Sequence, residues 1–184
     1  MTDLGTDSTA LDRWAADARV DDAAQRRARR RWLDQQLREE SSLRGLLVDV
    51  AEARKVVTIT ASDQRRSTGR VHTVGADYVA LHGDDGVVVV IALAAVRLVT
   101  ATAGAPTGER APVVRQHLHA LLFDWAAERP EVVLRVRDVD EPVRGELQSV
   151  GVDVLSLIGA STDRASMFVP LDSVIAVAGV VSVL

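Results

Sequence analysis

The sequence predicts a mainly β protein with helices (α+β): a long N-terminal helix followed by two tandem small barrels, each a helix plus five strands, related by internal duplication. Residues 69–81 read GRVHTVGADYVAL and residues 145–157 read GELQSVGVDVLSL. In both, apolar and polar residues alternate on either side of a Val-Gly-x-Asp break, a pattern typical of two strands joined by a tight turn. Its recurrence half a chain later indicates a duplication.

The N-terminal region precedes both copies. Residues 1–9 are rich in Asp, Ser, Thr and Gly, which predicts disorder. Residues 10–41 contain no Gly or Pro and are rich in Ala, Arg, Gln and Leu, which predicts one long helix. Its apolar stripe is too sparse to bury a full face, so we expect the helix to project, to pack along a narrow seam or to pair with a second copy. The residues of this seam are Leu11, Trp14, Ala18, Ala28, Trp32 and Leu37.

Residues 42–100 are predicted to form the first small barrel with its leading helix. A serine at position 41 or 42 can cap that helix, because its hydroxyl accepts from free N–H groups of the first turn. The helix then has one apolar face, made by Leu43, Leu46, Leu47 and Val50. Strands are expected at residues 56–60, 69–74, 78–82, 87–93 and 96–99.

Residues 101–112 (ATAGAPTGERAP) have no apolar period and are predicted to be a linker. Residues 113–184 are predicted to form the second barrel with its leading helix, whose apolar face repeats the spacing of the first. Each copy has roughly 60 residues, a size at which a domain buries too little surface to be stable alone. We therefore expect the two copies to pack on each other or on a partner.

The order of one helix and five short strands resembles SH3-like and Sm-like (LSm) small barrels. The residues that carry the resemblance lie in the two Val-Gly-x-Asp segments, in the Ile91-Ala92-Leu93-x-x-Val96 segment and in its counterpart at 169–174. The whole chain also resembles a set of uncharacterised actinobacterial proteins, which have an Arg/Ala-rich N-terminal helix before tandem small barrels. The resemblance implies two barrels and, for the Sm-like branch, RNA binding.

The residues of an Sm-type RNA site are missing from this chain. Such a site uses an Asn after the Asp of the first motif and an Arg-Gly pair in the second, whereas this sequence contains no Asn and no Arg-Gly after either fourth strand. RNA binding is therefore not transferred to this chain residue by residue.

The glycines and aspartates of the two breaks are predicted to be structural turn residues. In a tight turn Gly supplies a positive φ and Asp accepts a backbone N–H, so these residue types need no catalytic explanation. The positions are Gly75, Asp77, Gly151 and Asp153.

One strongly basic run lies in the N-terminal helix and consists of Arg26, Arg27, Arg29, Arg30 and Arg31. It is a candidate contact for nucleic acid or for an acidic partner. The alternative is a solvated helix face, which the Asp and Glu residues of the same segment favour because they balance its charge. Trp14 and Trp32 are interpreted as packing residues rather than as platforms for stacked bases.

The sequence provides no catalytic constellation. No Gly-x-Ser-x-Gly, phosphate loop, dinucleotide fingerprint or His-Glu-x-x-His occurs. His117 and His119, two apart on a predicted helix, face different directions and are not expected to chelate one metal ion. We therefore expect no enzyme activity, no cofactor, no metal and no small-molecule substrate.

Composition narrows the class of protein further. The chain has 184 residues, no Cys and a formal net charge of −4, which suits a cytoplasmic protein and argues against a surface built mainly to bind phosphate backbones. No apolar run is long enough to span a membrane. The preferred hypothesis is a non-catalytic scaffold that binds a protein partner or itself, through the N-terminal helix or the barrels. The alternative is a nucleic-acid-binding regulator that uses Arg26–Arg31.

Overall fold

The computed structural model describes residue 29 and residues 42–83, 86–101, 115–159 and 164–179. The chain divides into two units between residues 41 and 42. Of the first unit only Arg29 is described, with helical backbone and an exposed side chain. The predicted N-terminal seam, the predicted disorder of residues 1–9 and almost all of the predicted linker lie outside the described residues.

The first half of the second unit has one α-helix, five strands and a short 3-10 helix. The strands lie where the alternation predicts them, and α2 covers the predicted apolar face. In chain order these are α2 (Leu43–Glu52), β1 (Val56–Ala61), β2 (Arg66–Val74), β3 (Tyr78–His82), β4 (Val88–Ala92), η1 (Leu93–Ala95) and β5 (Val96–Ala101).

The second half has the same order of elements. Its α-helix and strands follow the order of one helix and five strands that the sequence predicts for residues 113–184. They are α3 (Leu118–Ala126), β6 (Glu131–Val136), β7 (Val143–Val150), β8 (Val154–Gly159), β9 (Ser166–Pro170), η2 (Leu171–Ser173) and β10 (Val174–Gly179).

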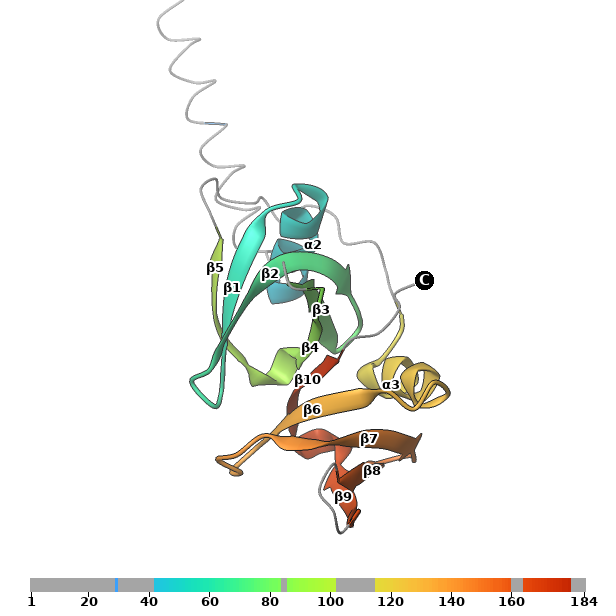
Figure 1. Ribbon diagram of the computed structural model, residues 1–184. Coiled ribbons are helices and arrows are strands. Elements are labelled where there is room, and N and C mark those ends of the chain that lie inside the picture. The colour runs from blue at the N-terminus through green and yellow to red at the C-terminus, as the bar shows by residue number, and fades with distance from the viewer. Residues whose placement is uncertain (1–28, 30–41, 84–85, 102–114, 160–163, 180–184) are drawn as a thin grey trace, which may run out of the picture. The chain divides into compact units, whose positions relative to one another are not determined.

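All ten described strands form one open antiparallel sheet in the order β5-β1-β2-β3-β4-β10-β6-β7-β8-β9 (Figure 1). The predicted fold class is therefore wrong. The chain does not form two tandem SH3-like or Sm-like barrels built as duplicated, self-contained units behind a long helix. The physical reason is that β10 does not stay at the edge of its own half but is inserted between β4 and β6, which joins both halves through backbone hydrogen bonds.

The β4–β10 pairing is the seam of the sheet. Its register runs from Ala176 opposite Ile91 to Gly179 opposite Val88, while the other edge of β10 pairs with β6 from Val174 to Gly179. The strand can take this central place because it is apolar on both faces, as a strand buried from two sides must be. Four consecutive residues, 174–177, are buried.

Two hydrophobic cores share the strands of the seam. One core contains α2 residues such as Leu47, and the other contains α3 residues such as Leu122. Neighbouring residues of β3 belong to different cores, because successive side chains point to opposite faces of a strand. Tyr78 packs in the α3 core and Val79 in the α2 core. Each half thus contributes residues to the core of the other. The two halves pack on each other, as we expect for units of this size.

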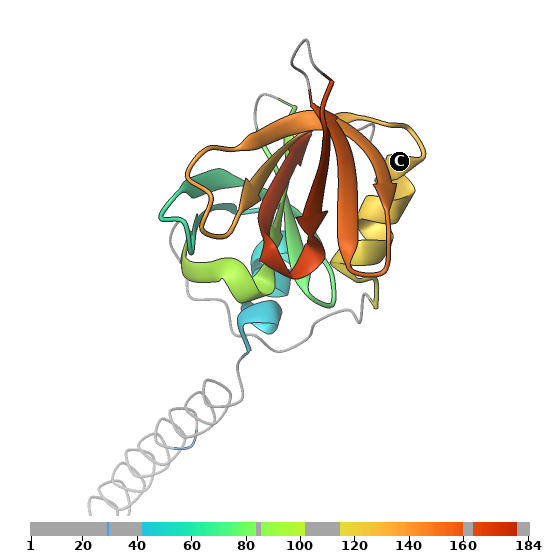
Figure 2. The same cartoon turned by 90° about the horizontal axis from the view of Figure 1, so that it is seen from below.

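Each helix packs its apolar side on the strands that follow it. Among the described elements α2 contacts β2, and α3 contacts β7; Figure 2 shows α3 in yellow beside the orange and red strands of the second half. Ser42 caps α2, since its hydroxyl oxygen accepts from the Gly45 N–H at 3.0 Å. His117, at the equivalent position of α3, has no such side-chain bond.

No helix in the described ranges has the length and the apolar character needed to cross a bilayer.

Gly75 is required by the close approach of a buried ring. A Cβ atom at this position would overlap the ring of Tyr78, which is fully buried and cannot move aside. A Cβ at Gly151 would instead lie 3.2 Å from Cγ1 of the partly exposed Val154. We predict that Gly75→Ala lowers the free energy of unfolding by about 1–3 kcal/mol, because overpacking forces neighbours off their rotamers.

Gly151→Ala is the matched control and should change stability by no more than about 0.5 kcal/mol. Urea denaturation of both variants measures the difference. Equal effects of the two substitutions would contradict the steric role of Gly75.

Candidate functional site

The turn between β2 and β3 caps α3. Oδ1 of Asp77 accepts a hydrogen bond from the backbone N–H of Leu118 at 2.7 Å, and Oδ2 lies 3.1 Å from Nδ1 of His117. A carboxylate at this place satisfies a free N–H of the first turn and is favoured by the helix dipole. Asp77 therefore supplies the cap that α3 lacks within its own segment.

A second set of polar contacts continues from this cap. The backbone N–H of Ala76 donates to the carbonyl of Gln116 at 2.8 Å, and the Tyr78 hydroxyl donates to Oε1 of Gln116 at 2.9 Å. Gln116 also donates through Nε2 to Asp124 at 3.3 Å. Burial, followed by the negative charges of Asp77 and Asp124, raises the pKa of Tyr78. These contacts fix the start of α3 against the first half.

In the part of the chain that the structure describes, no helix or loop covers the corresponding turn between β7 and β8. Gly151 donates its N–H to the Val154 carbonyl and Asp153 accepts from the Leu171 N–H, as Gly75 and Asp77 do in the first turn. Gly151, Val152 and Asp153 are nevertheless all exposed, Val152 to 93%. Within the described ranges, no α-helix begins beside Asp153 for its carboxylate to cap.

The four turn residues thus lie at the β2–β3 and β7–β8 turns, as the sequence places them, but the expected positive φ is absent at both glycines. Among the described glycines only Gly86 has a positive φ. Gly75 is needed for space against Tyr78. The side chain of Asp77 accepts from a distant helix rather than from its own turn.

The two ends of the sheet are open edges over the described ranges. There β5 pairs with β1 only, and β9 pairs with β8 only. Both edges carry large exposed apolar side chains: Leu98 of β5 is 58% exposed and Phe168 of β9 is 70% exposed. An edge strand offers unpaired N–H and C=O groups, so it is a template for pairing with another strand.

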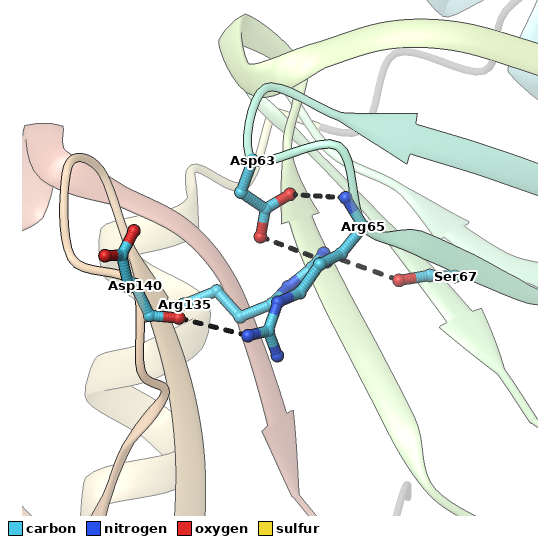
Figure 3. Close-up of polar contacts among 5 residues, drawn as sticks. All are labelled: Asp63, Arg65, Ser67, Arg135 and Asp140. Carbon is cyan, nitrogen blue, oxygen red and sulfur yellow. Dashed lines mark hydrogen bonds and ion pairs between the residues drawn. The ribbon is translucent and has the colours of Figure 1, made fainter.

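A polar cleft of about 550 Å³ lies where the β1–β2 turn faces the β6–β7 turn. Arg135 of β6 pairs with Asp63 at 3.3 Å and donates to the Ser67 hydroxyl at 3.4 Å. Arg65 donates to the Asp140 carbonyl at 3.0 Å, so the β1–β2 turn contacts both the β6 strand and the β6–β7 turn (Figure 3). The complete lining is Ser62, Asp63, Arg65, Arg97, Arg135, Val136, Arg137, Asp138, Val139, Asp140, Pro142 and Ile175.

Arg135 is the most enclosed cation of this cleft. Its side chain is 13% exposed. Burial lowers the pKa of Arg135, the carboxylate of Asp63 acts against this, and the nearby positive charge of Arg65 lowers the pKa further. The cleft therefore holds two guanidinium groups close enough to repel each other.

The predicted contact residues of the N-terminal helix are not brought together by any described contact. Of Arg26, Arg27, Arg29, Arg30 and Arg31 only Arg29 is described, and it is exposed. The predicted seam residues Leu11, Trp14, Ala18, Ala28, Trp32 and Leu37 all lie outside the described ranges. Both assignments stay predictions.

Sequence reasoning missed the cleft. A signal was present, since Arg and Asp cluster at the first turn of each half, as Asp63 and Arg65 in one and as Arg135, Arg137 and Asp138 in the other. Aspartates in turns were explained by backbone preference alone. The facing arrangement depends on β10 joining the halves, and the alternation of apolar and polar residues does not say which strand β10 pairs with.

Groups of three or more His, Cys, Asp or Glu side chains with metal-binding geometry were not found among the described residues. His117 contacts Asp77, and His119 stacks on Phe123 with ring centroids 6.4 Å apart.

No protein-family model matches the sequence, and no curated protein is similar to it.

We predict that Asp77→Ala destabilises the fold by about 1 kcal/mol, the usual value of a lost helix cap. Asp153→Ala is the matched control, since Asp153 has the same backbone bond but no helix to cap, and should change stability by less than about 0.5 kcal/mol. Thermal unfolding of both variants checks this. An Asp77→Ala protein as stable as the parent would refute the cap.

Tyr78 is the only tyrosine of the chain, so the tyrosinate absorbance of the protein reports the titration of this side chain alone. Its pKa is raised in the folded state, so folding favours the neutral phenol. The resulting stabilisation is complete below the unfolded pKa of about 10 and is lost as the pH rises through the folded pKa. Tyrosinate absorbance at 295 nm should therefore rise at higher pH in the folded chain than in urea. Identical titration curves in the two states would contradict the burial of the hydroxyl.

Proposed function

We propose that this protein is a non-catalytic interaction module that associates with further copies of itself through the two open edges of its sheet. The observation that supports the proposal is the β4–β10 seam. There the fourth strand of one half pairs with the fifth strand of the other. The two strands left at the edges, β9 and β5, are the remaining fourth and fifth strands.

The seam provides a template for the contact between copies. In the seam, Ala176 faces Ile91 and Gly179 faces Val88. Counting back from η1 and η2, Val169 and Ser166 occupy the positions of Ile91 and Val88. Likewise, Leu98 and Ala101 occupy the positions of Ala176 and Gly179. The same register between two molecules would place Leu98 opposite Val169 and Ala101 opposite Ser166.

The exposed β7–β8 turn supports the same arrangement. In the seam, the equivalent β2–β3 turn is covered by the segment that leads into α3. A second copy at β9 would bring its own α2 towards Val152 and Asp153. The exposure of Val152 and Phe168 would then fall on association.

The contact between copies should be weaker than the seam inside the chain. On the face of β3 and β4 that packs in the α3 core, Ala80 and Val88 are buried. Ser156 and Ser166 occupy the equivalent positions of β8 and β9. Two apolar residues of the seam are thus replaced by serines at this edge, and buried apolar area is the main driving force of association. We therefore expect association that depends on concentration.

The other sequence-based hypotheses stay open beside this proposal. The N-terminal seam would add a further contact between copies, and a cytoplasmic location suits a chain without Cys. Nucleic-acid binding by Arg26–Arg31 is supported only by the exposed Arg29. Its signature would be binding that falls steeply with salt.

We predict that Phe168→Lys converts the associated protein to a monomer, because a lysine on an edge strand opposes pairing with another strand. Phe123→Lys is the matched control: Phe123 is 59% exposed and belongs to α3, which packs on the internal strand β7 rather than on an edge strand. Light scattering after size-exclusion chromatography over a range of concentrations measures the mass. A monomeric parent at every concentration, or equal effects of the two variants, would refute the proposal.

A disulfide trap tests the register in the same full-length chain, which has no natural Cys. Ala101→Cys and Ser166→Cys proteins, mixed and oxidised, should form a cross-linked heterodimer. Replacing Ser166→Cys by Thr68→Cys, a position on the internal strand β2, should abolish it. Equal cross-linking of both mixtures would contradict the register.

A further inference from the structure

The cleft between the β1–β2 and β6–β7 turns carries an excess of arginine. Arg65, Arg97, Arg135 and Arg137 line it together with three aspartates, Asp63, Asp138 and Asp140. The four arginines come from different places in the fold: the β1–β2 turn, β5, β6 and the residue after β6. Arginines from strands and turns that are far apart in the sequence thus line the same cleft.

Three of these arginines are held by neutral acceptors. Arg65 donates to the carbonyl of Asp140, Arg137 to the carbonyl of Asp172 at 3.2 Å, and Arg97 to the carbonyl of Ala94 at 3.0 Å. A backbone carbonyl fixes the guanidinium but leaves its charge uncompensated. Within the described part of the chain, the ion pair between Arg135 and Asp63 is the one that joins an arginine of the cleft to a carboxylate.

The carboxylates of the cleft do not neutralise all of its arginines. Asp63 is occupied by Arg135 and by the Arg65 backbone N–H at 3.2 Å. Asp138 and Asp140 are exposed, and in the described ranges their carboxylates make no ion pair with the four arginines. Arg65, Arg97 and Arg137 donate to backbone carbonyls only, so an added anion would neutralise positive charge that these contacts leave in place.

The floor and rim of the cleft are apolar. Val136 and Ile175 are buried beneath it, while Val139 is 47% exposed at its edge. The volume of about 550 Å³ lies within the range of roughly 300–1,000 Å³ typical of small-molecule sites. A ligand that suits this lining has an anionic group for the arginines and an organic part for the apolar rim.

We propose that this cleft binds a small organic phosphate, with the phosphate group held by Arg65, Arg97 and Arg137 and the organic part placed against Val139. A guanidinium fork matches phosphate oxygens in pairs, so several arginines bind a phosphate dianion better than a single carboxylate. Arg135 keeps its partner Asp63 and holds the two turns together. The site is separate from the strand edges, and its occupancy does not depend on self-association.

Isothermal titration of the full-length protein at low ionic strength tests the proposal. The probes are adenosine monophosphate, pyrophosphate, citrate and uncharged adenosine. Adenosine monophosphate and pyrophosphate should bind, adenosine should not, and citrate should bind more weakly than pyrophosphate. No heat from either phosphate compound, or citrate binding as strongly as pyrophosphate, would overturn the assignment.

Matched variants locate the site. Arg65→Gln and Arg97→Gln should each weaken the binding of adenosine monophosphate by about tenfold or more, as expected for a lost charge-assisted hydrogen bond. Arg70→Gln, at an exposed arginine of β2 outside the cleft, should leave affinity unchanged. Circular dichroism confirms that each variant is folded. Equal losses in all three variants would show binding by general surface charge and would refute the cleft as the site.

Discussion

The backbone pairing of β4 with β10 is the constraint on which the described fold depends. It turns two groups of five strands into one sheet. It also buries β3 from both sides, because the α2 core and the α3 core lie on opposite faces of that strand. The Asp77 cap and the cleft lie between the two halves, so both exist only because the seam fixes the halves against each other. Loss of the pairing would therefore remove both features together.

The secondary structure of the second unit was predictable from the sequence, whereas its assembly was not. Alternation of apolar and polar residues predicts a strand but does not depend on which strand it pairs with. The positions of the strands were therefore predictable, whereas their pairing partners were not. A closed barrel and an open sheet use the same local pattern. The run of valines in β4 and the apolar residues 174–177 of β10 were a usable signal, because strands apolar on both faces belong inside a sheet.

The site residues were predicted less well, for a related reason. Asp77 stands in a turn, where Asp is explained by local backbone preference, yet its carboxylate caps α3, which begins at Leu118. Arg65 and Arg137 belong to no motif in the sequence, yet they line one cleft. Roles that depend on contacts between the two halves cannot be read from spacing within either half.

The place of β10 in the sheet has a consequence for how the protein is made. A ribosome delivers the chain from its N-terminus, and the strand that completes the middle of the sheet emerges after the other nine described strands. Until then the nascent chain displays β4, with Val88, Val90 and Ile91, as an apolar strand without its neighbour. Pairing across so long a stretch of chain is slow. A truncated chain that ends before Val174 would lack β10. It would therefore expose the apolar edge of β4 that β10 covers in the full-length protein.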